Sequence, residues 1–216
     1  MTRLLTLGLA AAGLFALAPA GAVASPSISE VYYDAVGSDD GLSFVELWGA
    51  PGTDLEGYLL EGINGTNGAI SPSLALSGSI PADGFFVVAD GLLDGSTLVA
   101  EADLILNFDL QNGPDSLQLL APDTSVIDAL GYGEFAPGEI FAGEGSPSVD
   151  PPAGSAVARI FANVDTDQNA LDFAAAAPSP GSAPLTAVPE PGSGLLVCAG
   201  LGGLARLGRK RPSPRG

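Results

Sequence analysis

The chain has 216 residues, with 25 Asp and Glu, 7 Lys and Arg, one Cys and no His, for a formal net charge of −18. The absence of His excludes a Ser-His-Asp triad, a His-ligated zinc and an imidazole base, and one Cys excludes an intrachain disulfide. The negative charge also argues against nucleic-acid binding, because that affinity comes from Lys and Arg displacing counterions from phosphates.

Residues 1–24 have the layout of a secretory signal peptide: Arg3, then an apolar run over 4–17, then small residues up to Ala24. This layout predicts cleavage between Ala24 and Ser25. The alternative is a membrane anchor, but the apolar run is shorter than the roughly 20 residues that a spanning helix needs.

The charge is concentrated in the body that follows. Between Ser25 and Val188, Arg159 is the only cation, and that stretch holds all of the 25 acidic residues except Glu190, so its formal charge is −23. Such a charge keeps a secreted domain soluble, and salt or bound divalent cations are expected to relieve its self-repulsion.

The body has about 160 residues, enough for one domain. Short runs of β-branched, aromatic and Leu residues recur between Gly, Pro, Asn and Asp, a spacing typical of an all-β sandwich or barrel. The expected strands are 28–36, 42–50, 55–63, 84–89, 102–110, 115–121, 125–132, 155–161 and 170–175.

Two of these runs also predict burial. Leu104, Leu106, Phe108 and Leu110 alternate with polar residues, so we expect one face of that strand in water. Residues 85–88, Phe-Phe-Val-Val, are continuously apolar, which indicates a central strand buried on both faces. We expect the Gly-, Pro- and Ser-rich segment 134–153 to be partly disordered.

Two patterns point to chemistry. Asp165, Asp167, Asn169 and Asp172 alternate oxygen ligands along a loop, as a Ca²⁺ site requires. The pattern lacks the Gly and the final Glu of an EF-hand loop, and the alternative is an ordinary Asx-type turn.

Glu46 lies in the apolar run FVELW. Glu46 is the one residue whose position in the sequence indicates a general acid or base, as a carboxylate-based hydrolase would need. The alternatives are a half-exposed carboxylate or one paired, for example with Arg159.

The C-terminal segment combines three parts in order. Pro189, Glu190 and Pro191 open it, an apolar stretch runs over 192–208, and a basic cluster closes it: Arg206, Arg209, Lys210 and Arg211. Seventeen apolar residues, counted with Arg206 at the interface, are about the lower limit for a membrane span. The basic end would stay in the cytoplasm.

This tail resembles a PEP-CTERM sorting signal, although its membrane stretch is richer in Gly than is usual and contains Cys198. The resemblance implies removal of the tail by an exosortase. The alternative is a permanent single-span anchor.

The body resembles a bacterial lamin-tail domain. The similarity spans residues 28–181 and is carried mainly by FVEL, DLEGY and the DTDQNALDF…PSPG end, while 62–80 and 134–153 depart from the family. The resemblance implies an immunoglobulin-like β-sandwich of an exported protein. It also places Arg159 in a strand, where we expect it to bridge to a carboxylate.

The sequence thus predicts a signal peptide (1–24), a lamin-tail-like β-sandwich (25–181), a linker (182–188) and a sorting signal (189–216). We expect a non-enzymatic adhesion or structural module without a cofactor, transiently anchored in the inner membrane and then located at the cell surface or outside the cell. Its expected partners are the Sec translocon, signal peptidase, an exosortase, and extracellular polysaccharide or other surface proteins, but no nucleic acid. The alternatives are a calcium-dependent binding module and the hydrolase.

Overall fold

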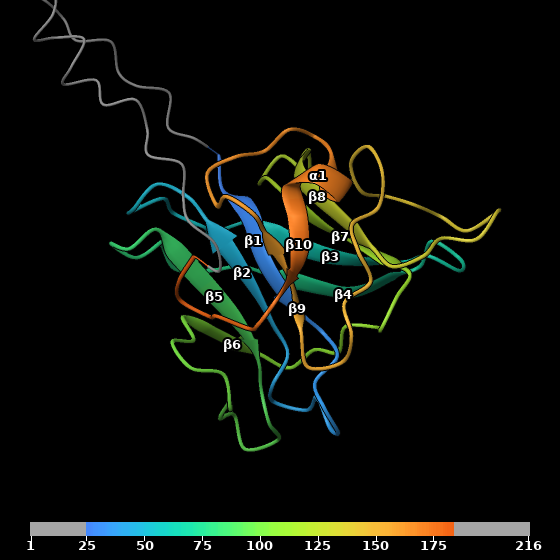
Figure 1. Cartoon of the computed structure of the whole chain (residues 1–216). Coiled ribbons are helices and arrows are strands. Elements are labelled where there is room, and N and C mark those ends of the chain that lie inside the picture. The colour runs from blue at the N-terminus through green and yellow to red at the C-terminus, as the bar shows by residue number, and fades with distance from the viewer. Residues whose placement is uncertain (1–24, 184–216) are drawn as a thin grey trace, which may run out of the picture.

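The structure is a computed structural model that describes residues 25–183. This part of the chain forms short strands and one helical turn (Figure 1). The elements are β1 (Ser27–Tyr32), β2 (Phe44–Trp48), β3 (Leu59–Asn64), β4 (Ile70–Ala75), β5 (Phe85–Asp90), β6 (Leu104–Leu106), β7 (Asp115–Leu120), β8 (Val126–Tyr132), β9 (Ala156–Arg159), α1 (Asn169–Asp172) and β10 (Phe173–Ala176).

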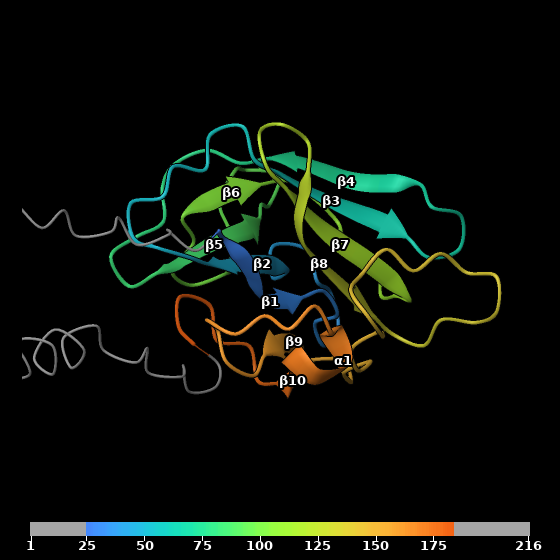
Figure 2. The ribbon, with the colours of Figure 1, turned by 90° about the horizontal axis from the view of Figure 1, so that it is seen from above.

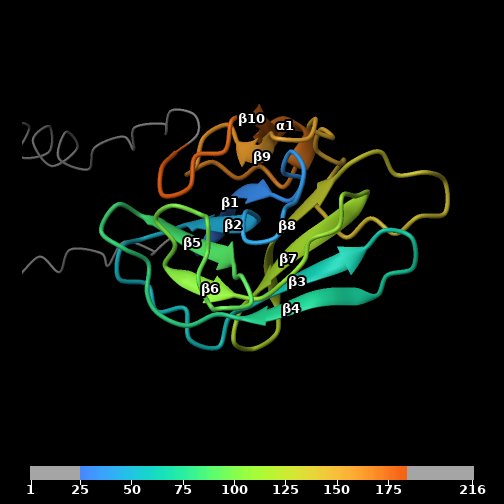
Figure 3. The same ribbon diagram turned by 90° about the horizontal axis from the view of Figure 1, so that it is seen from below.

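The strands form two sheets. One has six strands in the order β10-β9-β1-β2-β5-β6, and the other has four in the order β4-β3-β7-β8. Figures 2 and 3 show β3 and β4 on one side of the body and β9 and β10 on the other. Among the paired strands of the described residues, only β5 and β6 run parallel. The predicted all-β sandwich is confirmed.

The core lies between the two sheets. Residues from both sheets meet there with almost no exposure, among them Val45, Leu47, Leu60, Leu117 and Leu130. In β5, Phe86, Val87 and Val88 are all buried, although successive side chains point to opposite faces. The prediction that this strand is buried on both faces is therefore confirmed, and both faces of the six-stranded sheet must be covered there.

Three elements differ from the prediction. Strand β4 was not expected, because Ser and Pro72 weaken its pattern; Pro is tolerated there because β4 is an edge strand. The run 102–110 pairs only over β6, although its burial alternates as predicted up to Leu110. The run 170–175 begins with α1 and becomes strand only at Phe173.

The segment 134–153 has no helix or strand but follows a defined course, so the disorder expected there is not found. The Ile140 N–H donates to the Gly65 carbonyl at 2.7 Å. Phe141 stacks edge-on to Phe135 and packs on Gly131, where an added Cβ would lie 2.1 Å from its ring. The absence of a side chain at Gly131 therefore lets the loop close on β8.

After β10 the chain folds back over the outer face of the six-stranded sheet. We call this segment, residues 177–183, the strap. Its turn is closed by the Ser182 N–H, which donates to the Ser179 carbonyl at 3.1 Å. In Figure 1 the orange-red strap leaves β10 and crosses toward β5. The turn spans the predicted boundary between body and linker, and residues 184–188 of that linker lie outside the described range.

The core between the two sheets can be tested with one buried and one exposed Leu. Leu47 is 0% exposed and Leu93 is 102% exposed. We expect Leu47→Ala to lower the free energy of unfolding by about 2–5 kcal/mol, because it removes buried contacts and leaves a cavity. We expect Leu93→Ala to change it by less than about 0.5 kcal/mol. Urea unfolding followed by tryptophan fluorescence measures both, and equal effects would contradict the assignment of this core.

Candidate functional site

Arg159 is the only cation among the described residues, and it is completely buried at the end of β9. Its side chain lies at the end of the sandwich where β1, β8 and α1 come together. A buried guanidinium is costly unless its donors are all used. The neighbours of Arg159 therefore define the first candidate site.

Every part of the guanidinium has a partner. Nε–H donates to the Ile28 carbonyl at 2.9 Å, and Nη2 donates to both carboxylate oxygens of Asp128, the nearer at 2.9 Å. Nη1 donates to the Val164 carbonyl at 3.1 Å and lies 3.2 Å from Asp165. The predicted bridge from Arg159 to a carboxylate is confirmed.

Asp128 completes this arrangement from β8. Its side chain is 1% exposed and also accepts the Ile28 N–H, so it binds the backbone of β1 as well as Arg159. Burial nevertheless raises the pKa of Asp128, and the nearby Arg159 only partly offsets that rise. The ion pair is thus an internal connection between the two sheets.

The four residues predicted to bind calcium do not gather into one group of possible ligands, although Asp165 and Asp172 both contact Nη1 of Arg159. Asn169 accepts the N–H groups of Gly131 and Glu144 and donates to the Ala129 carbonyl, which anchors α1 to β8. Asp172 accepts the N–H and hydroxyl of Thr166. Both side chains are used inside the body.

The other two predicted ligands, Asp165 and Asp167, are exposed. The Asp167 N–H donates to the Asp165 carboxylate, as in an Asx turn. Of the predicted set, only Asp165 joins a cluster that could hold a metal.

That cluster is Asp128, Glu144 and Asp165, with one carboxylate oxygen of each within 4.8 Å of the others. Glu144 comes from the 134–153 loop, and its Oε2 is buried without a hydrogen-bond partner. Burial, and then the charges of Asp128, Asp165 and Asp167, raise its pKa to about 7. No local sequence pattern marks Asp128 and Glu144 as ligands, because only folding brings residues this far apart in the chain together.

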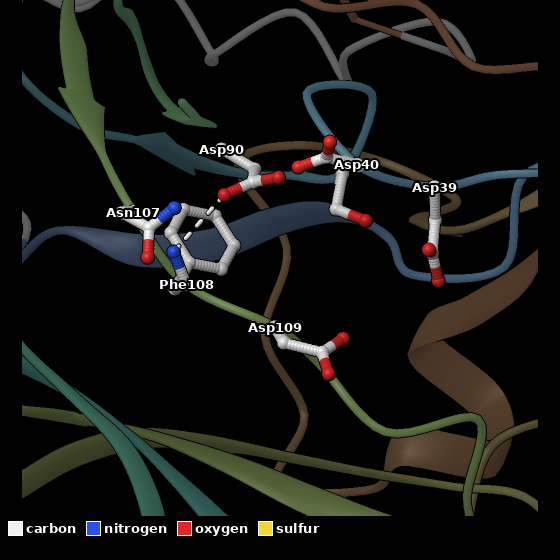
Figure 4. A pocket seen from close by; sticks show the side chains of 7 residues that line it. Asp39, Asp40, Asp90, Asn107, Phe108 and Asp109 are labelled. Atoms are coloured by element: carbon white, nitrogen blue, oxygen red, sulfur yellow. Dashed lines mark hydrogen bonds between the residues drawn. The ribbon is translucent and has the colours of Figure 1, made fainter. Parts of the chain in front are cut away.

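A second acidic site is a hollow of about 300 Å³ at the edge of the six-stranded sheet (Figure 4). Asp39, Asp40 and Asp109 line it together with Asp90. Asp90 is engaged already, since it accepts the N–H groups of Phe108 and of Gly41, which has a left-handed backbone at φ +73°. The remaining carboxylates give the hollow a negative lining suited to a cationic group.

Glu46, the residue nominated for catalysis, is fully buried on the outer face of β2. Its partner is not Arg159, which lies on the opposite face of the sheet. Instead Glu46 accepts the Gly181 N–H of the strap at 2.7 Å. Glu30 of β1 lies directly opposite Glu46 in the strand register.

The targeting residues predicted from sequence fall almost entirely outside the described residues: Ala24, Pro189, Glu190, Pro191, Arg206, Arg209, Lys210 and Arg211. Ser25, at the start of the described range, is exposed. Within residues 25–183 no helix has the length and apolar character needed to cross a membrane.

Comparison of the chain with protein-family models, curated proteins and solved structures gave no match. The lamin-tail and PEP-CTERM resemblances therefore rest on the sequence motifs.

The Arg159 network makes a stability prediction. We expect Arg159→Met to lower the free energy of unfolding by about 3–5 kcal/mol, because it leaves Asp128 charged, buried and unpaired. Arg159→Lys keeps the charge but loses the fork that serves Ile28 and Asp128 together, so we expect an intermediate loss. Urea unfolding at neutral pH checks both variants, and a loss below about 1 kcal/mol for Arg159→Met would refute this role.

Proposed function

We propose that this chain is an exported, non-enzymatic adhesion or structural module of the cell surface or extracellular matrix, with an immunoglobulin-like body of the lamin-tail type. The observation that carries the proposal is the tail, in which Pro189-Glu190-Pro191, a short apolar stretch and a basic cluster follow one another within 28 residues, 189–216. An exosortase removes this tail after the Sec translocon and signal peptidase have acted.

The use of the carboxylates supports a non-enzymatic role. The buried ones accept backbone N–H groups, as Asp90 does from Gly41, Asp115 from Gly65 and Asp128 from Ile28. Glu46 is 0% exposed beneath the strap, so a substrate would reach it only after the strap moved. These carboxyl groups thus serve the fold.

The sorting proposal predicts the ends of the mature protein. Material released from a Gram-negative host that has an exosortase is expected to begin at Ser25 and to end near Pro189, because both targeting segments are removed. Intact-mass measurement of the released protein checks both ends. Released protein that still carries Arg209–Arg211 would falsify the proposal.

A matched pair of variants separates sorting from folding. Glu190→Ala changes the motif and is expected to leave the full tail on a membrane-bound chain. Glu134→Ala changes an exposed body carboxylate of the same type and is expected to be processed normally. Equal processing of the two variants would assign the tail to permanent anchoring or to another use.

A second function, calcium-dependent binding, is favoured by the convergence of Asp128, Glu144 and Asp165. Carboxylate oxygens suit Ca²⁺, and the partnerless Oε2 of Glu144 offers a free ligand atom. Arg159 opposes it, because its guanidinium already neutralises part of the charge at Asp128 and Asp165. Through this site the module would bind acidic polysaccharide by a calcium bridge.

The calcium site predicts proton release. Since the pKa of Glu144 is raised to about 7, Ca²⁺ binding near neutral pH must displace part of a proton from it. Calorimetry in buffers of different ionisation enthalpy measures that release. We expect Glu144→Gln to weaken binding at least about ten-fold, the scale of one charged ligand lost.

The control is Glu134→Gln, an exposed carboxylate from the same loop, which is expected to bind as the unmodified chain does. Every titration is repeated with NaCl at matched ionic strength, so that screening of the −23 body is not mistaken for a site. Absence of calcium-specific heat, or equal affinity of the two variants, would reject the site.

A further inference from the structure

Two carboxyl groups lie side by side under the strap. Glu30 of β1 and Glu46 of β2 are paired in the strand register, and both residues are 0% exposed. They occupy the outer face of the six-stranded sheet, while Arg159 points to the inner side, where it stacks on the core residue Phe173. Two adjacent buried carboxyls without a cation are costly when both are ionised.

The strap covers the pair and binds both members. Ser179 donates to Glu30 through its N–H at 3.0 Å and its hydroxyl at 2.8 Å, and the Gly181 N–H donates to Glu46 at 2.7 Å. Gly181 has φ +79°, and an added Cβ would lie 2.8 Å from Glu101, so glycine suits this turn. The strap is thus held to the sheet through these two carboxyl groups.

A buried hydroxyl group, that of Ser29, lies beside the pair. Oε1 of Glu46 and the hydroxyl oxygen of Ser29, which occupies the irregular position of β1 beside it, are both buried and complete no well-aligned hydrogen bond. The Ser29 hydroxyl can donate to Glu46, and this contact lowers the pKa of Glu46, so it favours the ionised carboxylate. It does not outweigh the burial of the two adjacent carboxyl groups, which favours their protonated form.

Burial is the main influence on both groups. It raises the pKa of Glu30 from 4.5 to about 7 and that of Glu46 from 4.5 to about 8, and the hydrogen bonds from the strap only partly offset the rise. The charge of Glu30 adds to the rise at Glu46. Both groups therefore titrate near neutral pH while the strap is closed.

Within residues 25–183, the surroundings of the pair add no positive charge. Opposite the pair, β9 contributes Ala158 and β5 contributes Val87, and β10 holds only Phe and Ala. The titratable groups near the strap and these strands are the side chains of Tyr32, Glu101 and Asp103. None of these side chains is a cation, so none of them stabilises the ionised pair.

We propose that Glu30 and Glu46 form a proton-operated latch: protonated, they hold the strap closed on the sheet, and ionised together they release it. Release frees the chain from residue 177 onward and so lengthens the connection between the body and the segment that follows. The latch acts whether or not that segment is a sorting signal.

The direction follows from proton linkage. Each carboxyl binds its proton more tightly in the closed state than in an open, hydrated state with a pKa near 4.5. The protonated pair therefore gives its full stabilisation of the closed state below pH 4.5, and this is lost as the pH rises toward 7 and 8. The strap opens with increasing pH and changes little beyond that range.

Hydrogen exchange of the strap tests the latch. The purified full-length chain, kept in mild detergent because of its apolar ends, is exchanged at several pH values and analysed by mass spectrometry of the peptide that contains Ser179 and Gly181. After correction for the intrinsic pH dependence of exchange, we expect the opening equilibrium to rise at least about ten-fold from about pH 6 to about pH 8. If the strap closes independently of the two carboxyl groups, the opening equilibrium will not rise with pH, and that result would contradict the latch.

Variants assign the effect to the pair. In Glu30→Gln/Glu46→Gln the side chains keep their size and cannot ionise, so the strap is expected to stay protected across this range. The control is Glu101→Gln, which removes an exposed carboxylate next to Gly181 and should keep the wild-type pH dependence. The same pH dependence in the double variant and the wild type would overturn the latch.

A second measurement needs no variant and so does not depend on the folding of the double variant. The side-chain carboxyl ¹³C shifts of Glu30 and Glu46 are followed through a pH titration of the wild-type chain. Titration of at least one group above about pH 6 supports the latch. Titration of both groups below about pH 5 overturns it.

Discussion

The buried Arg159 is the interaction on which the rest of the body depends. It is the one cation available to 24 carboxylates between Ser25 and Val188, and the fold places it inside the sandwich. Its donors reach the backbone of β1, Asp128 of β8 and the loop before α1, and its guanidinium lies 4.5 Å from the centre of the Phe173 ring. The Arg159 side chain thus connects the two sheets with each other and with the loop before α1.

Arg159 is the only cation among the described residues, and several other buried carboxyl groups of the body accept backbone N–H donors instead. Asp90 and Asp115 each accept at least one such bond, and Glu30 and Glu46 accept theirs from the strap. These acceptors fix loops and segments that lack strand pairing. The same solution leaves carboxyl groups in dry surroundings, which is why several have raised pKa values.

The strap connects this electrostatic arrangement to the proposed export of the protein. It is the last described segment before the residues that resemble a sorting signal, and it is held by groups that titrate near neutral pH. The proposed latch would couple the opening of the strap to proton binding, without any added ligand. Such a latch would give an acidic body with one cation a response to pH that does not need His.

The sequence by itself determined the all-β class and most strand positions, because alternating apolar residues and turn residues are local signals. It also indicated a carboxylate partner for Arg159, because this is the one cation of a strongly acidic body. Tertiary structure alone decided which carboxylates meet. Asp128 and Glu144 join Asp165, and Glu30 faces Glu46 beneath the strap, through contacts between residues distant in the chain. It also decided β4, since an edge strand forms by pairing with β3 despite a weak pattern of its own.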